Sequence, residues 1–116
     1  MEYLIWIEVR IDERSRVHVP SAFRGIDPGD ELTISIGSGP CLVLEKPGRE
    51  EGDLKLHRQV DKERRVVLGE NLLRTIGLGP KSDAVIASTG ERLEVWPLQK
   101  WQQRLKALMK AASQAN

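Results

Sequence analysis

This sequence lacks long apolar runs, paired cysteines and an excess of charge of one sign. Its most apolar stretch, from Tyr3 to Ile7, ends at Glu8, far short of the roughly 18 residues that a membrane-spanning helix needs. No basic region precedes that stretch and no small-residue cleavage site follows it, so a secretory signal is not expected. The sequence therefore predicts a soluble, cytoplasmic protein that does not enter membranes.

The sequence has few residues that could bind a metal ion or form a disulfide. The chain has one cysteine, Cys41, and two histidines, His18 and His57. A single cysteine cannot form an internal disulfide, and its place beside Leu42 and Val43 indicates a buried, inert thiol. The three residues offer no paired ligand spacing for structural zinc, which needs about four nitrogen or sulfur donors. We expect no metal site and no cofactor.

The charges nearly cancel, with 18 basic and 17 acidic residues and a net charge of +1. Overall charge therefore gives no argument for a nucleic-acid partner, and any such argument needs local clustering. Two clusters exist. Residues 10–24 and residues 58–65 each contain four basic side chains against two acidic ones. Both clusters fall at the same place in an internal repeat.

The repeat is visible when Ile11–Val19 is compared with Val60–Leu68, 49 positions later. Each copy carries Asp-x-x-x-Arg inside an apolar strand pattern. A copy of about 50 residues buries too little surface to be stable alone, so the two copies are expected to share one core. We predict a first repeat at 1–47, a linker at 48–57, a second repeat at 58–97 and a terminal helix at 98–116, with both repeats in one globular domain.

Apolar periodicity and turn residues predict a mainly β fold with short helices. In the first repeat, strands are expected at 3–11 and 16–19, a short helix at 20–24, and a hairpin over 32–46. In the second, strands are expected at 59–61 and 65–68, a helix at 70–76, and a hairpin over 83–96. After Pro97, apolar residues spaced three and four apart predict an amphipathic helix; they are Leu98, Trp101, Leu105, Leu108 and Ala112.

The repeated motif has a structural and a functional interpretation. An aspartate at a turn usually accepts hydrogen bonds from nearby backbone amides, and Asp12 and Asp61 could simply fasten their turns. The same carboxylates could hold Arg16 and Arg65 rigid, ready to donate two parallel hydrogen bonds to a phosphate or to guanine. The two interpretations are compatible. The candidate DNA-binding residues are Arg14, Arg16, Arg64, Arg65, Lys62 and His18, with Asp12 and Asp61 in support.

At these residues the chain resembles the MraZ family, whose pattern is Asp-x-Lys-Gly-Arg, a strand, a proline and a short helix. Residues 12–24 fit the first half of that pattern, and residues 61–65 occupy the motif in the second half. Glu94-Val95-Trp96 and Trp101 resemble the closing strand and C-terminal helix. The resemblance implies two swapped-hairpin, AbrB-like halves in a pseudo-two-fold β-barrel. It also implies a transcriptional regulator, associated with the nucleoid, that assembles into homo-oligomeric rings and reads short direct repeats in double-stranded DNA.

Three positions depart from the family pattern. Ser15 and Arg64 stand where the motif has glycine, and Gly69 stands where a proline follows the second strand. If the backbone needs positive φ at Ser15 and Arg64, each costs about 1–2 kcal/mol. The extra charge of Arg64 is expected to strengthen attraction to phosphate.

We thus predict a sequence-specific DNA-binding transcriptional regulator. The alternative is an AbrB-like antitoxin or protein-interaction module that binds a protein partner through the C-terminal segment. Enzymatic activity is not expected, because the sequence has no phosphate-binding loop, no nucleophile with its base in a recognisable context, and no metal cluster.

Overall fold

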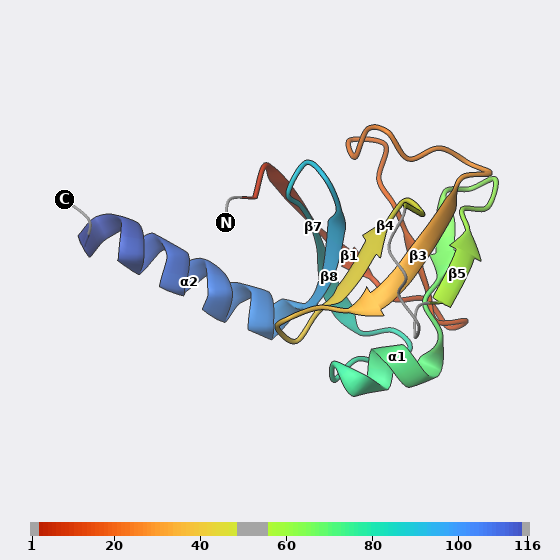
Figure 1. The fold of residues 1–116 in the computed structure, drawn as a ribbon. Coiled ribbons are helices and arrows are strands. Elements are labelled where there is room, and N and C mark those ends of the chain that lie inside the picture. Colours follow the sequence, from red (N-terminus) through yellow and green to blue (C-terminus); the bar gives the residue numbers. More distant parts are fainter. Residues whose placement is uncertain (1–2, 49–55, 115–116) are drawn as a thin grey trace.

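The computed structural model describes residues 3–48 and 56–114. They form eight strands and two helices (Figure 1). The elements are β1 (Ile5–Arg10), β2 (Arg16–His18), β3 (Glu31–Ile36), β4 (Leu42–Glu45), β5 (Leu56–Gln59), β6 (Arg65–Val67), α1 (Glu70–Thr75), β7 (Asp83–Ser88), β8 (Leu93–Pro97) and α2 (Leu98–Gln114). The prediction of a mainly β fold with a C-terminal helix is confirmed.

The strands of the two repeats pair with each other reciprocally. Six strands form one antiparallel sheet in the order β1-β7-β8-β4-β3-β5. The first strand of the first repeat, β1, pairs with β7 of the second, while β5 of the second repeat pairs with β3 of the first. Neither repeat completes its own part of the sheet. The swapped-hairpin, barrel-like arrangement implied by the family resemblance stays a prediction.

The remaining strands, β2 and β6, form a separate two-stranded antiparallel ribbon. Arg16 pairs with Val67, Val17 with Val66, and His18 with Arg65. The ribbon contacts β1 through β2 and β5 through β6, the two edge strands of the large sheet. Because the motif turns of the two repeats directly precede β2 and β6, the ribbon brings these two turns into one region of the protein.

One hydrophobic core joins both copies. Ile11, Val17 and Val19 of the first repeat pack with Val60, Val66 and Leu68 of the second, and each is at most 1% exposed. These residues are 49 positions apart in pairs, so the same apolar pattern fills the core twice. Burial of apolar surface contributes about 25 cal/mol per Å², and here the buried surface is formed by residues of both copies.

A smaller cluster fastens the start of α2 to the sheet. Trp101 is 2% exposed and packs near Trp96 and Cys41. Beside it the buried carboxylate of Glu94 accepts hydrogen bonds from the Tyr3 hydroxyl at 2.7 Å and from Trp96 Nε1 at 2.9 Å. Burial, with Glu94 adding to it, raises the pKa of Tyr3 to about 12, so its hydroxyl keeps the proton that it donates. Beyond this anchor α2 projects away from the sheets (Figure 1).

Two local predictions were wrong. Residues 21–25 form turns and a bend in place of the predicted helix at 20–24. Strand β5 begins at Leu56, inside the predicted linker at 48–57, because β3 offers a free edge on which Leu56 pairs with Ile34 and His57 with Thr33. Residues 49–55 of that linker lie outside the described residues. The helices predicted at 70–76 and 98–116 are confirmed as α1 and α2, and residues 115–116 lie outside the described residues.

Candidate nucleic-acid interface

The two Asp-x-x-x-Arg motifs fold into turns of the same construction. In the first turn the backbone N–H of Asp12 donates to the Arg16 carbonyl at 2.9 Å, and the N–H of Ser15 donates to the Asp12 carbonyl at 3.1 Å. The equivalent bonds of the second turn, which begins at Asp61, are both 3.0 Å. The sequence repeat is therefore also a structural repeat.

Each aspartate holds both its turn and its arginine. Asp12 Oδ1 accepts the backbone N–H groups of Arg14 and Arg16 at 2.9 and 2.8 Å, and Oδ2 accepts Arg16 Nε at 2.7 Å. Burial alone would raise the pKa of Asp12, but these hydrogen bonds and the arginine charge outweigh it and lower the pKa. Asp12 thus fastens its turn and holds its arginine with the same carboxylate, and the DNA-contact role of that arginine stays a prediction.

The second turn repeats this arrangement. Asp61 Oδ1 accepts the N–H groups of Glu63 and Arg65 at 2.9 and 2.8 Å, and Oδ2 accepts Arg65 Nε at 3.0 Å. The backbone hydrogen bond from Arg65 is the main cause that lowers the pKa of Asp61. Both carboxylates are ionised at neutral pH and fix the direction of the neighbouring guanidinium group.

The positions where the family motif has glycine do adopt a left-handed backbone. Ser15 has φ 60° and Arg64 has φ 65°. Their carbonyls accept hydrogen bonds across the two repeats, from Leu68 N–H at 2.9 Å and from Val19 N–H at 2.8 Å respectively. The strained conformation is therefore kept because it joins the copies. Gly69 has φ 90°, a value that the ring of proline forbids, which explains why the family proline is absent there.

Arg64 fastens the first repeat from within, and its assignment as a DNA-contact residue requires correction. Its guanidinium group donates to four backbone carbonyls, those of Val19 at 2.8 Å, Ile26 at 2.7 Å, Pro20 at 3.1 Å and Phe23 at 3.5 Å. These donors are used inside the protein, so they do not offer a fork to phosphate. The guanidinium group of Arg64 therefore stabilises the fold and is not available to strengthen attraction to phosphate.

Two of these carbonyls, those of Pro20 and Phe23, belong to the segment predicted as a helix at 20–24. The Pro20 carbonyl also accepts the backbone N–H of Phe23 at 3.0 Å, in a turn. At the equivalent place in the first turn stands Ser15, whose side chain is too short to reach the corresponding segment of the second repeat. That segment forms the helix α1 instead.

The outer face of the ribbon brings the two motif arginines together. Val17 and Val66 are fully buried, so the alternation of side chains along a strand puts Arg16, His18, Arg65 and Val67 on the opposite face. Arg16 and Arg65 line one open depression with Arg14, Asp12 and Glu13. We call this face, with the exposed turn residues Arg14, Lys62 and Glu63, the ribbon surface.

Sequence reasoning missed one member of the ribbon surface, Glu63. Its carboxylate oxygen Oε1 accepts a hydrogen bond from Arg65 Nη2 at 2.9 Å. A signal was present, because Glu63 lies 49 positions after Arg14 and reverses the charge at that place in the repeat.

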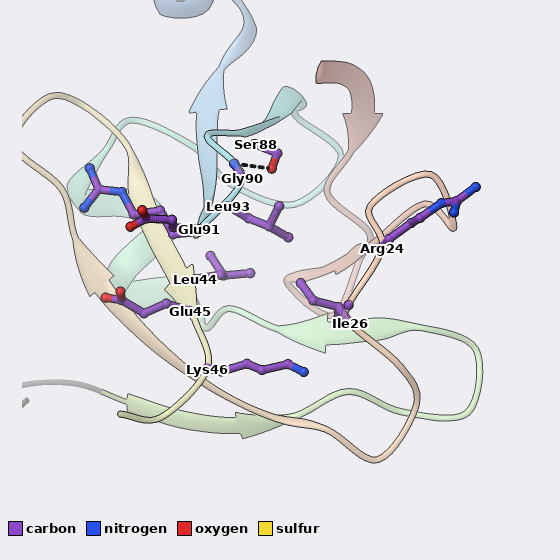
Figure 2. A pocket seen from close by; sticks show the side chains of 11 residues that line it. Arg24, Ile26, Leu44, Glu45, Lys46, Ser88, Gly90, Glu91 and Leu93 are labelled. Atoms are coloured by element: carbon purple, nitrogen blue, oxygen red, sulfur yellow. Dashed lines mark hydrogen bonds between the residues drawn. The ribbon is translucent and has the colours of Figure 1, made fainter. Parts of the chain in front are cut away.

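A second pocket, of about 220 Å³, lies between the loop at residues 24–26, the end of β4 and the turn joining β7 to β8 (Figure 2). Its wall mixes apolar side chains with both charges. Lys46 pairs with Asp30 at 3.6 Å and Arg92 with Glu94 at 3.1 Å, while the Arg24 side chain extends away from the others. This pocket lacks converging cationic donors and is not a candidate phosphate site.

Within residues 3–48 and 56–114, no group of three or more His, Cys, Asp or Glu side chains is arranged to hold a metal ion. Burial raises the pKa of Cys41 to about 11, which keeps the thiol protonated. None of the described helices is long and apolar enough to cross a membrane.

The ribbon surface and the fold together describe a mainly β protein with paired cationic turns. The family profile described as "MraZ protein, putative antitoxin-like" matches residues 57–116, just over half of the chain. The chain belongs to the MraZ family. This family is of the DNA-binding regulator type and is not a family of enzymes, and it implies a nucleic-acid partner.

Among solved structures, the chain is similar to "The solution structure of PHS018" from Pyrococcus horikoshii. Sequence identity is 22%, the TM-score is 0.43, and the alignment covers 82% of this chain and 89% of the other. A similarity of this degree indicates nothing about function. No curated protein sequence matches the chain significantly.

Proposed function

We propose that this protein is a sequence-specific transcriptional regulator that binds double-stranded DNA through the ribbon surface. The observation that carries the proposal is the common face of Arg16 and Arg65 on a two-stranded ribbon. The major groove is wide enough to admit such a ribbon, and each arginine already has its Nε held by an aspartate. Holding the side chain in advance lowers the entropy that binding costs.

The contacts divide by their positions on the surface. Arg16 and Arg65 donate to base edges or phosphates, Asp12 and Asp61 orient them, and the exposed Arg14, Lys62 and His18 contact the backbone at the rim. Arg64 is not included, because its donors are used by backbone carbonyls. The two repeats act as one domain in this proposal, since the ribbon takes one strand from each.

The larger assembly follows from the family resemblance. Several copies form a ring, and their ribbon surfaces bind successive short direct repeats, so that weak contacts add through multivalency. The protein acts in the cytoplasm on nucleoid DNA.

The experiment that tests this proposal is a salt series on duplex binding. For each lost phosphate contact the slope of log affinity against log salt changes by about 0.9. Arg16→Ala and Arg65→Ala should therefore flatten the slope, each by up to about one unit. Lys110→Ala, on the projecting end of α2, is the matched control and should leave it unchanged. Unchanged slopes in both turn variants would overturn the proposal.

A second candidate function is favoured by one observation. Tyr3, Trp6 and Trp101 line an open apolar groove together with Leu105, Leu108, Met109 and Ala112 of α2. An AbrB-like antitoxin or interaction module would use such a face to hold a protein partner. Under this alternative Leu105→Glu abolishes partner binding while Arg16→Ala does not, and duplex DNA binds only weakly.

A further inference from the structure

The two turns of the ribbon surface reverse their charges at two neighbouring positions, and at the first of these Lys62 of the second turn stands where the first turn has Glu13. Arg14 in the first turn corresponds to Glu63 in the second, 49 residues later. Arg14 is exposed, and its side chain forms no ion pair with any residue of the described ranges. Glu63 instead directs its carboxylate at the motif arginine of its own turn. The pseudo-symmetry of the backbone therefore does not extend to the charges.

Glu63 engages one more donor of Arg65 than is engaged on Arg16. Arg65 donates Nε to Asp61 at 3.0 Å and Nη2 to Glu63 at 2.9 Å. A guanidinium group recognises phosphate or guanine through two adjacent N–H groups on one edge, and Nη2 contributes one N–H group to each of its two edges. The bond to Glu63 uses one of these two N–H groups and places a carboxylate beside the fork. Arg16 uses only Nε, on Asp12, and keeps the edge formed by its two terminal nitrogens.

We propose that Glu63 is a specificity-determining residue that competes with DNA for Arg65, so that the first turn dominates binding. This inference rests on the function proposed above and names the residue through which its two turns differ at the motif arginine. The Glu63 carboxylate contacts Arg65 Nη2 through one oxygen, Oε1, and a phosphate oxygen would compete for the same donor. The bound complex then has a direction, because one end of the pseudo-symmetric ribbon binds DNA more strongly than the other. Such a polarity suits direct repeats better than palindromes.

The competitor can be displaced. The side chain of Glu63 is 65% exposed and that of Arg65 is 34% exposed, so solvent weakens their attraction. Exposed ion pairs of this kind change an equilibrium by about two- to fivefold. Removal of the Glu63 charge should increase DNA affinity by that factor and steepen the salt dependence, because a phosphate can then occupy the fork.

Duplex binding by fluorescence anisotropy, at several salt concentrations, tests this role. The set is the wild type, Glu63→Gln, Arg65→Ala and the double variant. Glu63→Gln should tighten binding about two- to fivefold at low salt, and the gain should vanish when Arg65 is absent. Arg16→Ala should weaken binding more than Arg65→Ala does.

Glu13→Gln is the matched control. Glu13 lines the same depression and carries the same charge, but it pairs with Lys81 at 3.7 Å instead of with an arginine of the ribbon. Its removal should increase affinity less than removal of Glu63. An equal gain from Glu13→Gln, a gain that persists without Arg65, or weaker or unchanged binding by Glu63→Gln would overturn the competition. A wild type that ignores duplex DNA at low salt would instead overturn the proposed function, and this inference with it.

Discussion

Ser15 and Arg64 occupy equivalent positions with nearly the same backbone conformation, at φ 60° and 65°. A left-handed backbone costs a non-glycine residue about 1–2 kcal/mol. Within the described residues the Ser15 side chain donates no hydrogen bond that offsets this cost. The Arg64 side chain donates hydrogen bonds to four backbone carbonyls of the other repeat. The same substitution should therefore change stability in opposite directions at the two sites.

Ser15→Gly is expected to raise the free energy of unfolding by about 0.5–1 kcal/mol, because strain relief exceeds the added entropy of the unfolded chain. Arg64→Gly is expected to lower it by about 1–3 kcal/mol, since hydrogen bonds from a charged donor are worth about 1.5–3 kcal/mol each and only part of that loss is offset. Urea unfolding monitored by tryptophan fluorescence measures both. A stabilising Arg64→Gly would contradict the structural role of this arginine.

The aspartates of the two turns predict how stability depends on pH. The pKa of Asp12 and of Asp61 is lower in the folded chain than the ordinary value near 3.8. Their contribution to stability is therefore complete above that value and is lost as pH falls through the lower folded value. Thermal unfolding between about pH 2 and pH 6 should show a fall in melting temperature below about pH 4. Asp61→Asn should make that fall shallower. If the variant loses melting temperature at low pH as steeply as the wild type does, the ionised carboxylate of Asp61 does not stabilise the fold.

Among the elements, α2 depends on a single anchor. The Trp101 ring lies 4.9 Å from that of Tyr3, 5.5 Å from that of Trp6 and 5.9 Å from that of Trp96. The helix beyond this contact is mostly exposed. We expect Trp101→Ala to lower the free energy of unfolding by about 3–5 kcal/mol. Met109→Ala, at a side chain 65% exposed, should change it by less than about 0.5 kcal/mol. Calorimetry distinguishes the two, and similar losses would contradict the single anchor.

Some elements could be predicted from the sequence and others could not. The turns at Asp12 and Asp61, α1 and α2 follow from local patterns, namely the repeat, the turn residues and the helical period. The helix predicted at 20–24 is absent, and its segment instead receives hydrogen bonds from Arg64 of the other repeat, a contact that no local pattern carries. The bond from Glu63 to Arg65 was open to prediction, because comparison of the two copies already shows the reversed charge.

At the scale of the whole molecule, the proposed ring makes affinity depend on the number of DNA repeats. Each ribbon surface is small and its arginines are partly neutralised by aspartates, so one surface alone should bind weakly. A duplex with three direct repeats should bind at least about tenfold more tightly than a duplex of the same length with one. Light scattering after size exclusion measures the assembly in parallel. A monomer with equal affinity for both duplexes would contradict multivalent binding.

The most direct measurement is an NMR titration of the ¹⁵N-labelled protein with duplex DNA at low ionic strength. It would follow the side-chain Nε–H signals of Arg16 and Arg65 and the backbone amides of both turns. Those of the first turn should shift most, with smaller shifts in the second turn and none in the outer half of α2. Shifts confined to α2, or no shifts at either arginine, would contradict DNA binding by the ribbon surface.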